Sequence, residues 1–351
     1  MALVIRATGS FGGDMRLLRI LTAIGAAASA ILLAGAPAHA EPAPGATRPT
    51  SASWVIRKDH WDASDEEGFG RFVAAIGESS CADPGACFES AANPWRHTDP
   101  PNFSVDGDCA DFIYQLRAYY SWKNGLPFSF AIYMMPLGGQ SAWLEDRRFT
   151  KSGNMVIGRL QIQWQSSTDP VQLFKSIRHT VSTAMFRTAP EYDHGFNASD
   201  FYSPRIDRTG IRAGTIVYDI NGHVYYVYKV TPDGKIHLLD SNPDRRVTRT
   251  VFGRHVPHNA PWLGAGFMNF RPIRLVDYAA GPGGTLVGGR FELARNTEIA
   301  DFSAEQFYGT EENPARDWTK SRYIVDGVEM KYFDFVAARM KLPEPVRAAA
   351  D

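Results

Sequence analysis

The clearest hydrophobic pattern in the chain follows Cys109. Apolar side chains recur there at the three- and four-residue spacing of a helix, at Phe112, Ile113, Leu116, Tyr119 and Tyr120. Asp108 is a suitable N-cap, and Gly125 with Pro127 beyond it is a typical stop signal. The pattern predicts an amphipathic helix that begins at Cys109, with Cys109 on its buried face, and ends near Gly125.

Short strand-like runs occupy residues 214–240. The runs 214–220 and 223–230 are separated by Asn221-Gly222, a pair typical of tight hairpin turns. The segment 231–234, TPDG, is a second turn signal, and 235–240, KIHLLD, is a third strand-like run. These runs predict three successive antiparallel strands.

Composition divides the 351 residues into four parts. Residues 1–40 are a candidate signal peptide, and 41–95 comprise a Pro- and Ala-rich leader and a helical or mixed segment. Residues 96–275 hold the helix and strands described above. The run 279–284, AAGPGG, predicts a loop or linker, so 276–351 is expected to be a Gly-rich linker with a helical extension, including a helix over 332–340.

The N-terminus has the pattern of a secretory signal peptide. Arg16 and Arg19 precede an apolar run over 20–34, and Ala38-His39-Ala40 is a small-x-small cleavage site. The alternative is an uncleaved anchor, but the run is shorter than the roughly 20 residues that usually span a membrane. We expect cleavage after Ala40, a periplasmic or secreted mature protein, and no integral membrane segment afterwards.

Charge and histidine spacing indicate neither a nucleic-acid partner nor a metal. The formal net charge is −1, which gives no basic field to attract nucleic acid. Asp106, Asp108 and Asp111 suggest a calcium loop, but Ala110 stands where the fifth-position oxygen ligand is needed. None of the 9 histidines falls in a metal-ligand spacing such as H-E-x-x-H. We expect no metal and no cofactor.

The three cysteines have different expected roles. Cys81 and Cys87 flank a Pro-Gly pair in CADPGAC, and a disulfide between them is plausible in an oxidising compartment. That pairing leaves Cys109 as a free thiol. Cysteine connectivity is not readable from spacing, so a bond from Cys109 to either of the others stays open.

Cys109 is the candidate reactive residue. At the first position of a helix, free backbone N–H groups and the helix dipole favour a thiolate over a thiol. A thiol held by its helix at the edge of the core is suited to nucleophilic catalysis. The alternative is a small buried apolar residue, as free cysteines commonly are. The cap position and the odd cysteine count favour the nucleophile.

A reactive thiol needs a base and a group that orients the base. His223 opens a strand directly after the Asn-Gly turn. If TPDG is a four-residue turn, His223 lies opposite Asn242, and Asp240 lies on the same face within diagonal reach. In that register His237 points to the other face, which makes it a packing or surface residue. The alternative for His223 is a solvated histidine at a strand end.

These residues resemble the papain-like group of cysteine hydrolases. Residues 108–112, DCADF, are similar to the Asp-Cys-Ser-Gly-Phe motif of NlpC-type cell-wall peptidases. Residues 213–242 resemble the His-bearing segment of the cysteine, histidine-dependent amidohydrolase/peptidase (CHAP) domains, and are also similar to transglutaminase-like domains. The likeness covers about 105–245, with an insertion-like stretch at about 130–210.

The resemblance implies an α+β, papain-like fold, in which the nucleophile helix packs on an antiparallel β-sheet between helical N- and C-terminal extensions. It implies that Cys109 is the nucleophile, His223 the base and Asp240 the orienting acid. Asn242 would correspond to the weaker Asn of the CHAP pattern.

The sequence departs from the family pattern at two points. Ala110-Asp111 stand where the NlpC motif has Ser-Gly. The papain-type Gln before the cysteine is absent, and Asn102 is the nearest amide for an oxyanion site. The backbone N–H of Cys109 is a further candidate donor for that site.

Three hypotheses for function follow. The first is an exported cysteine amidohydrolase or peptidase acting on peptide amides, with peptidoglycan peptides as the expected substrate. The second is a transglutaminase-like acyl transferase. The third is a non-catalytic cell-envelope binding protein, with aromatic side chains lining a groove unless they are core residues: Trp122, Trp143, Trp164, Tyr225 and Tyr228.

Overall fold

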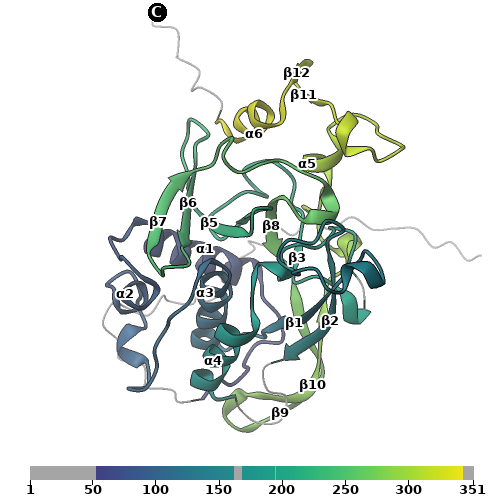
Figure 1. The fold of residues 1–351 in the computed structure, drawn as a ribbon. Coiled ribbons are helices and arrows are strands. Elements are labelled where there is room, and N and C mark those ends of the chain that lie inside the picture. The colour runs from purple at the N-terminus through teal and green to yellow at the C-terminus, as the bar shows by residue number, and fades with distance from the viewer. Residues whose placement is uncertain (1–52, 162–167, 194, 343–351) are drawn as a thin grey trace, which may run out of the picture. The chain divides into compact units, whose positions relative to one another are not determined.

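The structure is a computed structural model that describes residues 53–161, 168–193 and 195–342. The signal peptide expected over 1–40 and the leader up to residue 52 lie outside the described residues. Within them, helices combine with antiparallel sheets, which is the α+β class that the sequence predicts (Figure 1).

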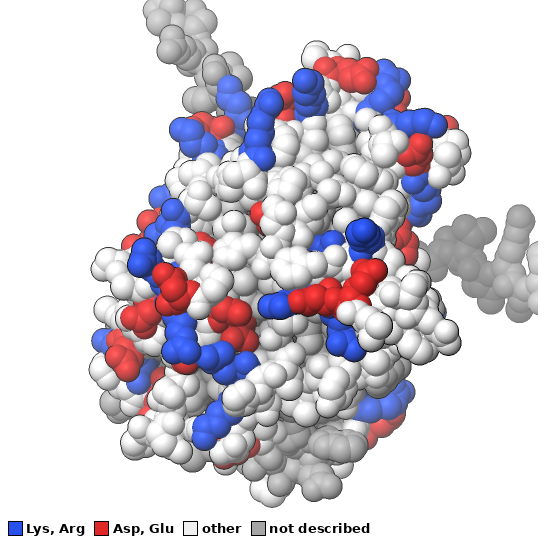
Figure 2. Space-filling model, viewed as in Figure 1, with Lys and Arg blue, Asp and Glu red and all other residues white. Residues whose placement is uncertain are grey.

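Charged side chains of both signs share the surface. On the face shown in Figure 2, Lys and Arg lie among Asp and Glu, and no large area carries a single sign. This mixture accords with the formal net charge of −1. Within the three described ranges, no helix is both long and apolar enough to cross a membrane.

The main sheet has six antiparallel strands. Their spatial order is β3 (Phe201–Tyr202), β8 (Gly266–Phe270), β4 (Ile216–Asp219), β5 (His223–Val230), β6 (Ile236–Ser241) and β7 (Val247–Val251). The three strands predicted over 214–240 are the neighbours β4, β5 and β6, with turns at the predicted places, although the second turn has five residues and not four. The strand-like runs and turn signals were therefore sufficient to predict the middle of this sheet.

The main sheet separates two apolar cores because successive side chains of a strand point to opposite faces. Ile216, Tyr226 and Leu239 belong to the larger core, which also contains helix α3 (Cys109–Asn124). Val217 and Leu238 belong to the smaller core, which contains helix α6 (Tyr332–Met340). The sheet thus has α3 on one face and α6 on the other (Figure 1).

Helix α3 has the predicted bounds but a different environment. It follows the N-cap Asp108 and ends before Gly125, whose left-handed φ of 66° closes the helix. Every residue from Cys109 to Trp122 is buried, so the helix is enclosed and not amphipathic. The reason is that α1 (Ala63–Glu78) and α4 (Pro170–Thr180) contact it in addition to β5 and β6.

The C-terminal part is not a linker followed only by helices, as the sequence suggested. β9 (Ile273–Ala280) and β10 (Leu286–Leu293) form an antiparallel hairpin, and its turn contains Gly283 and Gly284 in left-handed conformations. Glycine suits such a reversal as well as it suits a linker, so composition alone could not separate the two. Beyond this hairpin lie α5 (Glu305–Tyr308), β11 (Tyr323–Val325), β12 (Val328–Met330) and α6.

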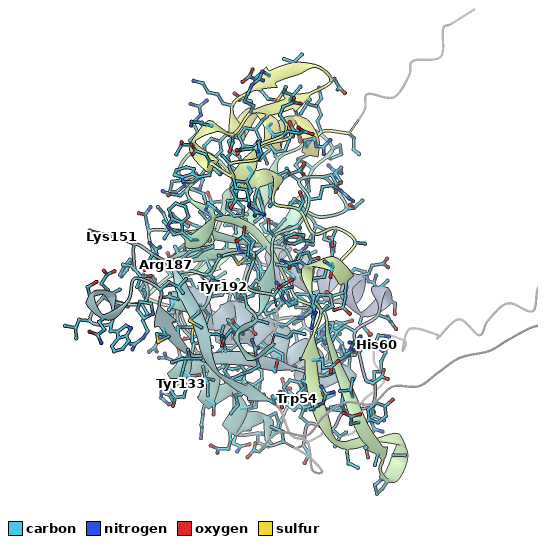
Figure 3. The ribbon with its side chains drawn as sticks, turned by 90° about the vertical axis from the view of Figure 1, so that its right-hand side faces the viewer. Trp54, His60, Tyr133, Lys151, Arg187 and Tyr192 are labelled. Carbon is cyan, nitrogen blue, oxygen red and sulfur yellow. A yellow bond between two sulfur atoms is a disulfide. The ribbon has the colours of Figure 1, made fainter. Side chains whose placement is uncertain are left out.

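The insertion-like stretch begins with a separate hairpin, β1 (Ser129–Pro136) and β2 (Asn154–Gln161). A long connection over 137–153 joins its strands. Figure 3 shows this region with Tyr133 of β1 labelled, together with Lys151 and Arg187. Its last residues lie beside the turn that carries His223.

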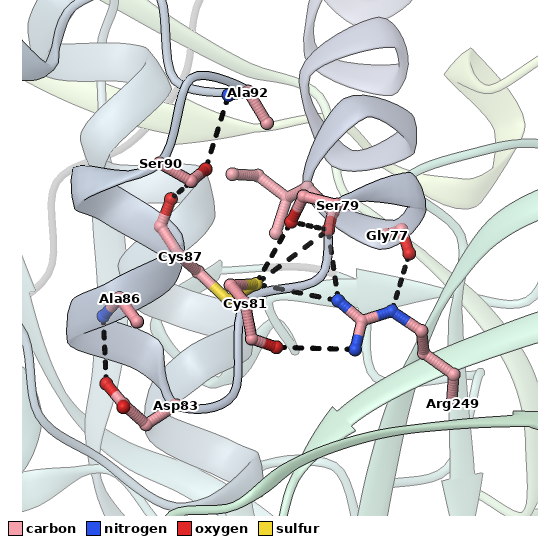
Figure 4. Close-up of a disulfide and its surroundings, with 10 residues drawn as sticks. Gly77, Ser79, Cys81, Asp83, Ala86, Cys87, Ser90, Ala92 and Arg249 are labelled. Atoms are coloured by element: carbon pink, nitrogen blue, oxygen red, sulfur yellow. Dashed lines mark hydrogen bonds between the residues drawn. A yellow bond between two sulfur atoms is a disulfide. The ribbon is translucent and has the colours of Figure 1, made fainter.

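Cys81 and Cys87 form a disulfide around the short helix α2 (Pro84–Glu89) (Figure 4). Asp83 caps α2 by accepting the N–H of Ala86 at 2.8 Å. Arg249 of β7 donates to the carbonyl of Gly77 at 2.6 Å and to that of Cys81 at 3.4 Å. The disulfide loop is therefore attached to the main sheet, and Cys109 remains a free thiol.

The left-handed closure of α3 leads to a stability prediction. We expect Gly125→Ala to lower the free energy of unfolding by about 1 kcal/mol or more, because an L side chain is strained there. An added Cβ would also lie 3.1 Å from the Arg57 side chain. Gly253→Ala is the control, since its Cβ would meet nothing closer than 3.7 Å. Equal stability of the two variants in urea denaturation would contradict this role of Gly125.

Candidate active site at the N-terminus of α3

Cys109 occupies the first position of α3 and is 4% exposed. The Asp108 carboxylate accepts the N–H groups of Ala110 at 3.1 Å and Asp111 at 3.4 Å. Asp111 in turn accepts the N–H of Asp108 at 3.2 Å, which completes a capping box. Among the described residues, the backbone N–H of Cys109 has no protein acceptor. It is therefore free to donate to a group bound at the sulfur.

His223 and Asp240 meet across β5 and β6. His223 Nε2 lies 2.7 Å from Asp240 Oδ2, and Asp240 is 2% exposed. Asp219 pairs with His223 at the end of the β4–β5 hairpin, directly beside the Asn-Gly turn. Because Nε2 is engaged with Asp240, the second ring nitrogen, Nδ1, is the one left for Cys109.

The face shared by His223 and Asp240 was predicted correctly, although the turn was not. The pairs Val230–Ile236 and Lys229–His237 leave five residues in the turn, which by itself would put Asp240 on the wrong face. A bulge between Val227 and Lys229 then shifts the pairing by one residue. Beyond the bulge the register is the predicted one.

Cys109 and Asp240 both set the electrostatics of His223. Burial lowers the pKa of His223, but hydrogen bonds to Asp240 and then to Cys109 raise it to about 10. The charges of both partners act in the same direction. The imidazole is therefore protonated at neutral pH and lies between the Cys109 sulfur and the Asp240 carboxylate, as in a cysteine–histidine–acid triad.

Asp240 is held by a neighbour that the sequence analysis missed. Thr248 Oγ1 of β7 donates to Asp240 Oδ1 at 2.6 Å, and Asn242 Nδ2 donates to Thr248 Oγ1 at 3.3 Å. Asn242 thus supports the carboxylate through Thr248. The signal for Thr248 was the short run VTRTV at 247–251, since a strand there pairs Thr248 with Asp240.

Two other side chains have no such link to the site. Asn102, the candidate oxyanion amide, is exposed on the loop before α3. Its side chain makes no hydrogen bond to Cys109, His223 or Asp240 among the described residues. The ring of His237 contacts Tyr228 at 5.8 Å between centroids, so it is a packing residue.

A buried arginine braces the surroundings of His223. Arg187 is 5% exposed and donates to the carbonyl of Ile220 at 3.0 Å and to the hydroxyl of Tyr218 at 3.2 Å. Its Nε donates to the carbonyl of Thr150 at 2.6 Å. Arg187 therefore joins the connection between β1 and β2 to the hairpin that carries His223. No local sequence pattern indicates this role, because its partners are distant in the chain.

The acidic residues beside Cys109 have structural partners. Asp106 forms ion pairs with Arg178 at 3.4 Å and Arg245 at 2.9 Å, and Asp108 and Asp111 form the capping box. Burial and then the charge of Asp108 raise the pKa of Asp111 to about 8. No group of three or more His, Cys, Asp or Glu residues in the described ranges is arranged to hold a metal.

Comparisons with protein-family models, with curated proteins and with solved structures found no match for this chain.

The aromatic residues considered as a binding groove are dispersed. Trp122 and Tyr228 are buried core residues, and Tyr225 stacks edge-on against His223 with 4.6 Å between ring centroids. Trp143 is exposed, and Trp164 lies outside the described residues. The described members thus form no common groove.

A cavity of about 1100 Å³ is not lined by Cys109, His223 or Asp240. It lies between the β1–β2 hairpin and β10, where Arg159, Arg290 and Phe291 contribute to its wall. The candidate active site is at Cys109, because the Cys109 thiol, the His223 imidazole and the Asp240 carboxylate interact there.

The electrostatics of His223 can be measured by NMR titration. We expect its midpoint near pH 10, falling by about one pH unit or more in Asp240→Asn, because a neutral amide stabilises the imidazolium less. Signals of His237 should not move in this variant.

Since the folded pKa of His223 lies above the ordinary 6.5, the contribution of His223 to stability is complete below about pH 6.5 and is lost as the pH rises towards 10. An unchanged midpoint in Asp240→Asn would contradict the pairing.

Proposed function

We propose that this chain is a cysteine amidohydrolase or peptidase of the papain-like type, exported from the cell. The observation that carries the proposal is the contact between Cys109, His223 and Asp240 at the N-terminus of a buried helix. The free thiol is at the helix terminus, and the helix packs on an antiparallel sheet that supplies the other two residues. The resemblance of 108–112 and 213–242 to NlpC-type and CHAP domains supports the same assignment.

The reaction uses the triad in two stages. Cys109 Sγ attacks the amide carbonyl carbon as a thiolate, and the backbone N–H of Cys109 donates to the oxygen that becomes negative. His223 donates its proton to the leaving amine, so the C–N bond breaks and an acyl thioester remains. His223 then takes a proton from water, which attacks the thioester carbonyl. The acid is released, and the sulfur regains its starting state.

Asp240 keeps the imidazole in the productive orientation. Its hydrogen bond to Nε2 leaves Nδ1 facing the sulfur through both stages. Thr248 and Asn242 hold the carboxylate, so the orientation of His223 depends on three adjacent strands. Peptide amides of the cell wall are the proposed substrate, because they are the abundant amides in the compartment that the signal pattern indicates.

Loss of the thiol tests the proposal. We expect Cys109→Ala to reduce hydrolysis of purified peptidoglycan and of peptide mixtures at least about 1000-fold, because the covalent step is removed. New amino and carboxyl termini are measured by mass spectrometry. His237→Ala is a matched control on β6 and should retain activity. Hydrolysis by Cys109→Ala at the wild-type rate would overturn the proposal.

The same assay separates hydrolysis from transfer. With a labelled primary amine present, we expect the wild-type protein to release free acid and to incorporate little label, because water resolves the thioester. Incorporation that exceeds acid release would assign the transglutaminase-like reaction instead. Tight retention on cell wall without either product would assign the non-catalytic alternative.

A further inference from the structure

The segment 143–151, part of the connection between β1 and β2, borders the turn that carries His223. An added Cβ at Gly222, the residue before His223, would lie 2.8 Å from Phe149 Cε1, so the phenyl ring packs on that turn. Arg148 lies within electrostatic reach of the N-cap before Cys109. Its pKa is raised first by hydrogen bonds to Asp146 and further by the Asp108 carboxylate. The segment therefore lies against the turn that carries His223, on the side of the α3 N-cap.

Segment 143–151 is fixed to the body of the protein by buried polar groups. Arg187 bonds the carbonyl of Thr150 on one side and that of Ile220 on the other, at 2.6 and 3.0 Å. Asn154, fully buried, donates to the carbonyl of Arg147 at 2.7 Å. Arg147 Nε donates to the carbonyl of Met134 at 2.7 Å. These bonds make the segment a wall of the site with a defined position.

Segment 143–151 exposes three large apolar side chains among charged ones. Trp143 is 52% exposed, Leu144 is 97% exposed and Phe149 is 51% exposed. Two of the charges on the segment compensate each other, since Arg148 donates to Asp146 at 2.6 Å. Large apolar side chains left open beside reacting atoms gain most from burial by an apolar part of the substrate.

We propose that segment 143–151 is the specificity wall of the site and selects acyl donors with a bulky apolar side chain next to the scissile amide. This inference rests on the proposed function, because it assumes that Cys109 attacks a carbonyl. Phe149 contacts the residue beside His223, so the group that it binds is close to the reacting carbonyl.

Affinity labels test the wall without requiring turnover. The probes are the chloromethyl ketones of N-acetylphenylalanine and N-acetylglycine, which differ only in the side chain. Cys109 Sγ attacks the chloromethyl carbon, so a C–S bond forms, the C–Cl bond breaks and chloride leaves. The rate of mass increase at Cys109 is followed by mass spectrometry. Iodoacetamide, which has no side chain to be selected, reports the reactivity of the thiol itself.

We expect the phenylalanyl probe to label wild-type Cys109 about tenfold faster than the glycyl probe, in the range that burial of one apolar group provides. In Phe149→Ala this preference should fall to about twofold or less, with the iodoacetamide rate unchanged. Tyr133→Ala is the matched control, because Tyr133 is 63% exposed on β1 outside the segment. It should keep the wild-type preference.

The two ways of failing are distinguishable. The specificity wall is overturned if the wild-type protein does not prefer the phenylalanyl probe, or if Phe149→Ala keeps the full preference. In either case, rapid labelling by iodoacetamide would still support Cys109 as the nucleophile. If all three reagents label Cys109 at the rate of an ordinary thiol, and His223→Ala does not change these rates, the proposed function fails and the wall fails with it.

Discussion

The capping box between Asp108 and Asp111 fixes where α3 begins, and the candidate site depends on that position. It places two hydrogen bonds on the N–H groups that follow Cys109 and leaves the N–H of Cys109 itself free. The arrangement costs stability, because Asp111 is 2% exposed and its Oδ1 has no partner among the described residues.

A series of side-chain contacts links Cys109 to three strands of the main sheet. Asp240 on β6 orients His223 on β5, and Thr248 on β7 orients Asp240. Arg187 makes a second attachment from the opposite side, since it joins the His223 hairpin to segment 143–151. The geometry of the site is therefore a property of strand pairing and of one buried guanidinium. The local sequence around Cys109 does not determine it alone.

Local signals predicted a large share of this architecture. The periodicity after Cys109 gave α3 with its cap and its end, and the turn signals gave β4 to β6. Residue parity along those strands placed His223 and Asp240 on one face. What could not be predicted depends on distant partners: the burial of α3 by other helices, and the attachments made by Arg187. The β9–β10 hairpin was missed because its glycines have the composition of a linker.

The turn at 231–235 and the bulge near Tyr228 have opposite effects on register. Either one alone would shift the pairing of β5 with β6 by one residue and put Asp240 on the opposite face from His223. Together the two shifts cancel. Neither can therefore change singly in evolution without moving Asp240 away from His223. Among relatives of this chain, the length of that surface turn should covary with the presence of the bulge. A relative with a turn one residue longer or shorter should therefore also lack the bulge, which would indicate selection for keeping His223 next to Asp240.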